Sequence, residues 1–276
     1  MQSLMGETPK TALHRLIKIS PSPHLPISPS PHLPISPSPH LPISPSPHLP
    51  ISPSPHLPIS PLPILMMNKI PILQPGKSYT FRSYFEMVVE PEDILAEFGY
   101  TLKRSSLNLE KSTTKLDRIS SLKSRIEESL PYVSLTSEAA RRELLIAPIL
   151  LDLVYYTQAQ LRIEYPLTVT EYLKGYLDYY LYTDSQLLVV EAKNANIPRG
   201  FTKLAVELIA LDLWSDTEQL ILEGAVSTGD IWQFGLLHRE HKQVTQDLNL
   251  YRVPADLEEL FRILIAVLGD RDGGRE

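Results

Sequence analysis

Residues 187–193 read L-L-V-V-E-A-K, and this short stretch determines the expected fold. Four consecutive apolar residues are typical of a strand that is buried on both faces. The strand then ends with Glu191 and Lys193, whose side chains share a face because alternate residues of a strand point to the same side. A buried charge needs a compensating partner, so the stretch predicts either a structural ion pair or a functional site.

The preceding segment supplies a partner for this strand. Residues 172–182 (Y-L-K-G-Y-L-D-Y-Y-L-Y) have the aromatic content of a strand, and T-D-S-Q at 183–186 predicts a turn. In a hairpin around this turn, the numbers of opposed residues sum to 369, which pairs Asp178 with Glu191. Two opposed carboxylates repel each other, and Mg²⁺ or Mn²⁺ would compensate because these ions prefer oxygen ligands.

The same residues have a plainer interpretation, which is a structural salt bridge between Lys193 and one of the two carboxylates at a sheet edge. An Asp followed at some distance by Glu-x-Lys is a weak pattern that often arises by chance. Its position on two predicted strands with opposed register favours a metal site.

The order of the remaining elements predicts a mixed α/β fold. A helix is expected over 138–156 behind the N-cap Ser137, and a second helix over 201–214. Before them we expect a strand at 79–89 and helices at 92–98 and 115–130. Strands are expected at 160–169, 172–182, 187–193, 220–228, 231–238 and 244–253, with a last helix from Pro254 to about Leu268.

The stretches G-Y-L-D-Y-Y-L (175–181) and L-L-V-V-E-A-K-N (187–194) resemble the PD-(D/E)XK nuclease superfamily. The resemblance extends from about Thr136 to Val253, and the body of the chain is also similar to cyanobacterial proteins assigned to that superfamily. It implies a restriction-endonuclease-like αβββαβ core, in which a mixed central sheet is flanked by helices. It further implies Asp178 and Glu191 as metal ligands and Lys193 as the catalytic lysine.

The resemblance implies further site residues on the two core helices. An acidic residue on the first helix often joins the site, and we choose Glu143 over Glu138 as a catalytic residue. Lys203 on the second helix matches a position that often carries Gln or Lys. Arg199 and Lys203 lie near the start of this helix and are candidate phosphate-binding residues, with exposure without a function as the alternative. Lys203 also fits a solvated ion pair with Glu207 four residues later.

The implied function is Mg²⁺- or Mn²⁺-dependent hydrolysis of nucleic acid, DNA in preference to RNA, by an endonuclease. Two alternatives stay open: an inactive nuclease-fold module with a binding or regulatory role, and a structural or interaction protein with a coincidental salt bridge.

Composition divides the chain into three parts: a tail (1–65), an N-terminal extension (66–130) and the nuclease-like core (131–270). Within the tail, residues 21–63 contain 17 of the 26 prolines, and S-P-S-P-H-L-P-I repeats every eight residues from Ser20. We expect it to be disordered, and we interpret its regularly spaced histidines as part of the low-complexity repeat rather than as a metal site. Met66 or Met67 is a candidate biological start.

Charge and cysteine content limit the function classes. The net charge is −6, and residues 1–65 carry +2, which leaves −8 on the body. An acidic body argues against nonspecific coating of nucleic acid, so substrate access would need a local groove, a homodimer or a partner subunit. The chain has no cysteine, no apolar run long enough to span a membrane and no recognisable signal peptide, and we expect a cytoplasmic protein.

Overall fold

The structure is a computed structural model that describes residues 71–184, 186–192 and 196–269. The repeat-containing tail of residues 1–65 lies outside the described residues, as does Lys193. The disorder expected for the tail and the role expected for Lys193 therefore stay predictions.

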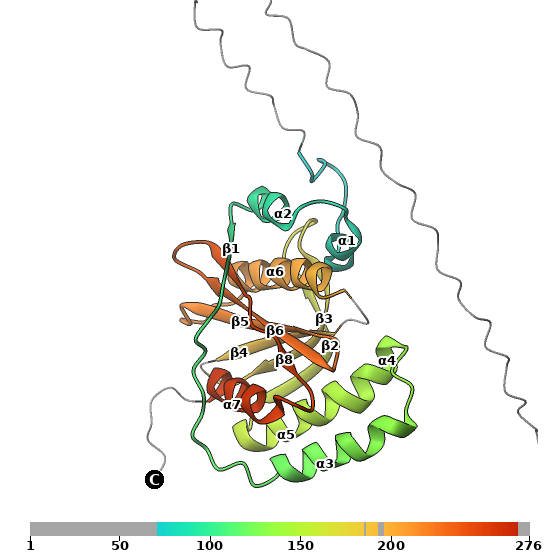
Figure 1. Ribbon diagram of the computed structural model, residues 1–276. Coiled ribbons are helices and arrows are strands. Elements are labelled where there is room, and N and C mark those ends of the chain that lie inside the picture. The colour runs from blue at the N-terminus through green and yellow to red at the C-terminus, as the bar shows by residue number, and fades with distance from the viewer. Residues whose placement is uncertain (1–70, 185, 193–195, 270–276) are drawn as a thin grey trace, which may run out of the picture. The chain divides into compact units, whose positions relative to one another are not determined.

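Within the described residues, eight strands form one mixed β-sheet (Figure 1). Seven of them follow the order β1-β7-β6-β5-β4-β3-β2, and β8 pairs with β6 beside this path. The pairs β1–β7 and β4–β5 are parallel, and the other pairs are antiparallel. The strands are β1 (Thr101–Ser105), β2 (Gln160–Thr168), β3 (Lys174–Tyr182), β4 (Leu187–Ala192), β5 (Ile221–Ser227), β6 (Ile231–His238), β7 (Gln243–Asp247) and β8 (Tyr251–Arg252).

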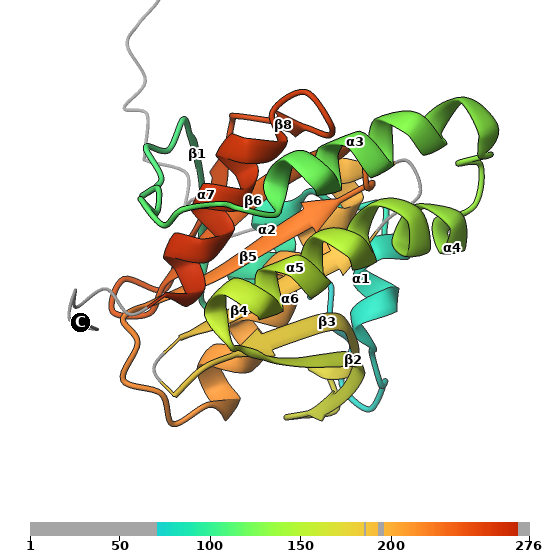
Figure 2. The ribbon, with the colours of Figure 1, turned by 90° about the horizontal axis from the view of Figure 1, so that it is seen from below.

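Helices cover both faces of the sheet, which confirms the predicted α/β class with a mixed sheet flanked by helices (Figures 1 and 2). One face carries α1 (Phe81–Glu86), α2 (Pro91–Glu97) and α6 (Ile197–Trp214). The opposite face carries α3 (Ile119–Ser129), the short η1 (Leu130–Tyr132), α4 (Glu138–Arg141), η2 (Arg142–Ile146), α5 (Ala147–Thr157) and α7 (Leu257–Leu268). None of the helices in the described part of the chain has both the length and the apolar character needed to cross a membrane.

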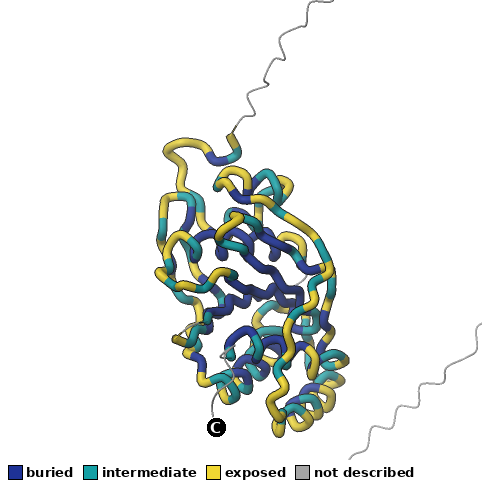
Figure 3. The backbone as a smooth tube through the Cα atoms, turned by 90° about the vertical axis from the view of Figure 1, so that its left-hand side faces the viewer, coloured by how far each residue is buried: buried dark blue, intermediate teal, exposed yellow. Residues whose placement is uncertain are grey.

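Strand β4 lies at the centre of two apolar cores, one on each face of the sheet. Leu188 and Val190 belong to the core under α5 and α7, whereas Leu187 and Val189 belong to the core under α6. All six residues of β4 are buried, as the L-L-V-V run predicts, and buried residues dominate the sheet (Figure 3).

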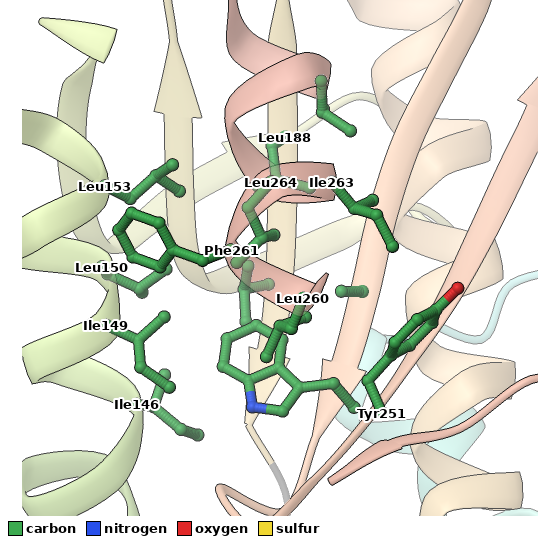
Figure 4. Packing of buried hydrophobic residues seen from close by; sticks show 14 of the residues in the cluster. Ile146, Ile149, Leu150, Leu153, Leu188, Tyr251, Leu260, Phe261, Ile263 and Leu264 are labelled. Carbon is green, nitrogen blue, oxygen red and sulfur yellow. The ribbon is translucent and has the colours of Figure 1, made fainter. Parts of the chain in front are cut away.

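The two cores are closed by different helices. On one face, Phe261 and Leu264 of α7 pack with Ile149 and Leu153 of α5 (Figure 4). On the other face, α6 is buried from Gly200 to Leu211. Helix α6 approaches β5 closely at Gly224, where a Cβ atom would lie 2.7 Å from Leu204 Cδ1.

The segment from α4 to β5 has a simple topology. The helical stretch α4–η2–α5 is followed by β2, β3 and β4, which are antiparallel neighbours. Helix α6 then returns the chain to β5, which lies parallel to β4. A helical crossover is the usual way to join two parallel strands.

The first helix of this segment is not regular. The helix expected over 138–156 is divided by η2, a π-helical turn that ends directly before Ala147 and Pro148. Pro148 lacks a backbone N–H and its ring displaces the carbonyl of the preceding turn, which explains an irregular turn at this place. Such π-turns are frequent at functional sites.

Two elements of the N-terminal extension differ from the expectation. The strand predicted at 79–89 is wrong, because this stretch contains α1, where Phe81 and Tyr84 are buried three residues apart, at helical spacing. Thr80 N donates to Ser83 Oγ and closes the first turn. Strand β1 was not predicted, since its only partner in the described chain is the distant β7 and most of its side chains are exposed.

Candidate active site

The β3–β4 hairpin has the predicted register. Tyr179 pairs with Val190 and Tyr182 with Leu187, so the numbers of opposed residues sum to 369 as expected. Asp178 directly precedes Tyr179 on β3, and its Oδ2 accepts a hydrogen bond from Ala192 N at 3.0 Å. This bond ties the Asp178 carboxylate to the end of β4 that carries Glu191.

The two carboxylates differ in how far they are buried. Glu191 is fully buried and alternates with Val189, which packs in the core under α6, so its side chain faces α6. The Asp178 side chain keeps 14% of its surface exposed. Of this predicted pair, Asp178 is the carboxylate that solvent reaches.

Lys203 joins the two strands to α6. Its Nζ donates to Glu191 Oε2 at 2.5 Å and lies 3.9 Å from Asp178 Oδ1. Glu207, one helical turn further along α6, places its Oε1 3.1 Å from the same nitrogen. Asp178, Glu191, Lys203 and Glu207 form one group, which we call the acidic cluster.

The surroundings of Lys203 fix its charge. Burial alone would lower the pKa of the Lys203 ammonium, but Glu207, Glu191 and Asp178 together outweigh this effect and raise the pKa above its ordinary value. Lys203 is therefore cationic at neutral pH. The idea of a solvated Lys203–Glu207 pair on a helix surface is wrong, because the two side chains are only 7% and 0% exposed.

The position of α6 explains why its charged residues point inward. Lys203 and Glu207 are four residues apart and share one face of a helix that packs against the sheet. Glu207 stands between apolar neighbours in A-V-E-L-I-A (205–210), so a glutamate in an otherwise apolar helix was the signal for this third carboxylate. Sequence reasoning had treated Glu207 only as the partner of Lys203.

A cavity of about 540 Å³ leads to the acidic cluster. Asp178 and Lys203 line it, together with residues of α1, β3 and the start of α4. On α4 the lining residue is Glu138, the carboxylate that sequence reasoning had rejected in favour of Glu143. Glu143 lies exposed on η2, where its charge acts on the Tyr179 hydroxyl and helps to raise its pKa, after the larger effect of burial.

The other candidate residues lie apart from this group. Arg199 is exposed in the first turn of α6, where its backbone N donates to the Asn196 side chain, and it lines a separate cavity of about 300 Å³. Arg142 of η2 was not considered from the sequence, yet its guanidinium lies 5.1 Å from the centre of the Tyr179 ring. The catalytic roles of Glu143 and Lys193 and phosphate binding by Arg199 stay predictions.

The suitability of the cluster for a metal rests on its donor atoms. Among the residues that the structure describes, no group of three or more His, Asp or Glu side chains is arranged to hold a metal ion. Asp178 and Glu191 nevertheless offer hard carboxylate oxygens, and Mg²⁺ often takes only one or two protein carboxylates while it keeps its waters. The two residues therefore fit as partial ligands.

Comparisons of the chain with protein-family models, with curated proteins and with solved structures gave no match. Arguments about its function therefore rest on the acidic cluster, on the cavity above it and on the topology of the strands around it.

Proposed function

We propose that the chain is a Mg²⁺- or Mn²⁺-dependent phosphodiesterase that hydrolyses nucleic acid, DNA in preference to RNA. The observation that carries this proposal is the meeting of Asp178, Glu191 and Lys203 beside a cavity of about 540 Å³. Paired carboxylates with a neighbouring amine at an accessible site are compatible with metal-assisted phosphodiester hydrolysis.

The topology gives independent support. A helical stretch, three antiparallel strands, a crossover helix and a parallel strand follow one another from α4 to β5. The PD-(D/E)XK resemblance implies the same order, with the Asp on the second strand and Glu-x-Lys on the third. Assignment of a restriction-endonuclease-like core is therefore part of the proposal.

Each described residue would have a distinct role. Asp178 and Glu191 would hold the metal, and the bond from Ala192 N would keep the Asp178 carboxylate in place. When bound, the metal would polarise a phosphoryl oxygen and lower the pKa of a water molecule. Because the pKa of Lys203 is raised, Lys203 would remain cationic, orient Glu191 and stabilise negative charge rather than accept a proton.

One observation favours a second candidate function. The Lys203 ammonium already neutralises part of the carboxylate charge, at 2.5 Å from Glu191 and 3.1 Å from Glu207. A cluster stabilised in this way fits an inactive module that keeps the shape of the site for a binding or regulatory role. Such a module would bind nucleic acid or a partner without cleaving it.

A cleavage panel with Mn²⁺ separates the two candidates. Single-stranded, double-stranded and branched DNA and RNA are incubated with the wild-type chain and with the Asp178→Asn variant. Asparagine keeps an oxygen that can accept the bond from Ala192 N, so this variant is expected to fold. The matched control is Asp184→Asn, which changes an exposed aspartate in the turn of the same hairpin.

We expect cleavage by the wild type and by Asp184→Asn, and none by Asp178→Asn. Mg²⁺ or Mn²⁺ should raise the melting temperature of the first two proteins only. A metal-dependent shift without cleavage of any substrate would support the inactive module, and neither shift nor cleavage would overturn both candidates.

A further inference from the structure

The cavity above the acidic cluster has a fixed wall formed by α1. Phe81 and Tyr84 of this helix are buried, and the Tyr84 hydroxyl donates to Tyr172 O at 2.6 Å. Phe81 packs so closely on Gly175 of β3 that a Cβ atom there would lie 2.9 Å from its ring. Helix α1 is therefore held against β3 close to Asp178, and it limits what can approach the cluster.

The reactive groups are reached through this cavity. The side chains of Asp178 and Lys203 are only 14% and 7% exposed, and both line it. Its volume of about 540 Å³ is typical of a site that encloses one small molecule or one unit of a polymer. A strand with an unstacked nucleotide can insert that unit, whereas the bases of a continuous duplex remain stacked and paired.

An exposed aromatic ring stands beside the reactive groups. Tyr176 precedes Asp178 by two residues on β3, lines the same cavity and is 63% exposed. Aromatic side chains with an accessible face are the usual stacking surface for unpaired bases. A tyrosine at this place suits a base whose phosphate lies at Asp178.

The charges around the cavity disfavour extended phosphate contacts. Among the described residues, its lining includes the carboxylates of Glu86, Glu138 and Asp178 and two cations, Arg82 and Lys203. Arg82 is already paired with Glu86 at 2.7 Å. A duplex held by many phosphates needs a basic surface, so most of the affinity here must come from contacts to a base.

We infer, on the basis of the proposed function, that the substrate is a single-stranded nucleic acid or an unpaired end, which inserts one nucleotide into this cavity and stacks its base on Tyr176. Residues 80–86, which form the α1 wall, thus belong to the substrate site rather than only to the packing of the extension.

Fluorescence anisotropy with the full chain tests this inference. The probes are a labelled DNA strand of about 15 nucleotides, near the upper end of known single-strand site sizes, the same strand annealed to its complement, and an RNA strand of the same sequence. Binding is measured in Ca²⁺, to limit hydrolysis, and at several salt concentrations. The variants are Tyr176→Ala, Tyr176→Phe and the control Tyr132→Ala, which removes a tyrosine that is 89% exposed on η1.

We expect the single strand to bind at least about 10-fold more tightly than the duplex, with a shallow salt dependence of log–log slope below about 2 in magnitude. Tyr176→Ala should weaken strand binding by about 5- to 150-fold, the range for one base stack, while Tyr176→Phe and Tyr132→Ala keep it. Comparison of the DNA strand with the RNA strand of the same sequence shows which of the two binds more tightly.

Equal or tighter binding of the duplex would overturn the inference, as would equal effects of Tyr176→Ala and Tyr132→Ala or no binding of any probe. Failure of the proposed function gives a different result, because strand binding through Tyr176 without cleavage would retain the inference for a binding module. Duplex cleavage unaffected by Tyr176→Ala would leave the nuclease intact and reject the single-strand substrate.

Discussion

Helix α6 contributes to two charge clusters, one buried and one half-buried, that differ in their partners. The acidic cluster brings three carboxylates to one ammonium beside a cavity. Near the other end of the helix, Arg239 donates to Asp212 Oδ1 at 2.6 Å, and the Tyr100 hydroxyl donates to Asp212 Oδ2 at the same distance. The first cluster gathers several carboxylates around one ammonium, whereas the second pairs one carboxylate with one guanidinium.

The partners of Arg239 show what a structural cluster looks like in this chain. Besides Asp212, its guanidinium donates to the backbone carbonyls of Ser215, Thr217 and Gln219. It thereby fixes the loop that follows α6. Backbone carbonyl partners indicate a structural role for Arg239, whereas the acidic cluster borders a cavity through Asp178 and Lys203.

The largest expected effect is on cleavage activity, which should depend on the acidic cluster and little on the cluster of Asp212 and Arg239. We expect Glu191→Gln to reduce Mn²⁺-dependent cleavage by more than about 100-fold, beyond the loss typical of an outer-shell partner of a metal. Asp212→Asn should lower the melting temperature and leave the specific activity of the folded protein within about threefold of wild type. Initial rates on the best substrate of the panel measure both, and equal activity losses would contradict the distinction.

The free energy of unfolding, in contrast, should depend strongly on the cluster of Asp212 and Arg239. Arg239→Ala leaves the Asp212 carboxylate without its cation, and we expect the free energy of unfolding to fall by roughly 2 kcal/mol, less than for a fully buried pair because the two side chains are 23% and 10% exposed. Urea denaturation measures this loss. Arg104→Ala is the control, because its pair with Glu92 is about 45% exposed and should contribute less than about 1 kcal/mol. Similar losses in the two variants would show that the Arg239 cluster is not structural.

A change in how α6 packs on the sheet should affect both clusters at once. Gly224→Ala places a Cβ atom 2.7 Å from Leu204 Cδ1 and 3.3 Å from Val189 O, so the helix or the Leu204 side chain has to move. We expect a loss of about 1–2 kcal/mol in urea denaturation, typical of overpacking, together with a lower cleavage rate. Lower stability with unchanged activity would show that the acidic cluster tolerates a shift of its helix.

The smallest effect is confined to alkaline pH. The pKa of Lys203 is raised above its unfolded value, so its contribution to stability is complete below about pH 10.4 and is lost as pH rises through the folded pKa. At pH 11 the expected loss is about 1 kcal/mol relative to pH 9, because the unfolded lysine has released its proton. Lys203→Arg should lack this component, and identical pH profiles for the two proteins in urea denaturation would contradict it.

The sequence predicted the hairpin because its register depends on local features. The turn at 183–186 and the two-residue periodicity of strands are enough to place Asp178 next to the end of β4, and the structure has that register. The contacts of Lys203 were not predictable in this way. They depend on how closely α6 packs on β5 and β6, which is a property of the folded chain.

The N-terminal extension shows where prediction of secondary structure from residue spacing fails. Residues 79–89 contain aromatic residues at spacings that fit both a strand and a helix, and packing of Phe81 on Gly175 selects the helix. Since the cavity wall depends on α1, this part of the proposed substrate site could not be predicted from the sequence. The choice between Glu138 and Glu143 also required the course of the chain around η2.

The pairing of β1 with β7 has a consequence for how the chain folds during its synthesis on the ribosome. Thr101 and its partner Gln243 are 142 residues apart, so β1 emerges long before its neighbour exists. At synthesis rates of about 5–20 residues per second, the delay is on the order of 7–30 seconds. Lys103 and Arg104 in this nascent strand would discourage other chains from pairing with it until β7 is synthesised.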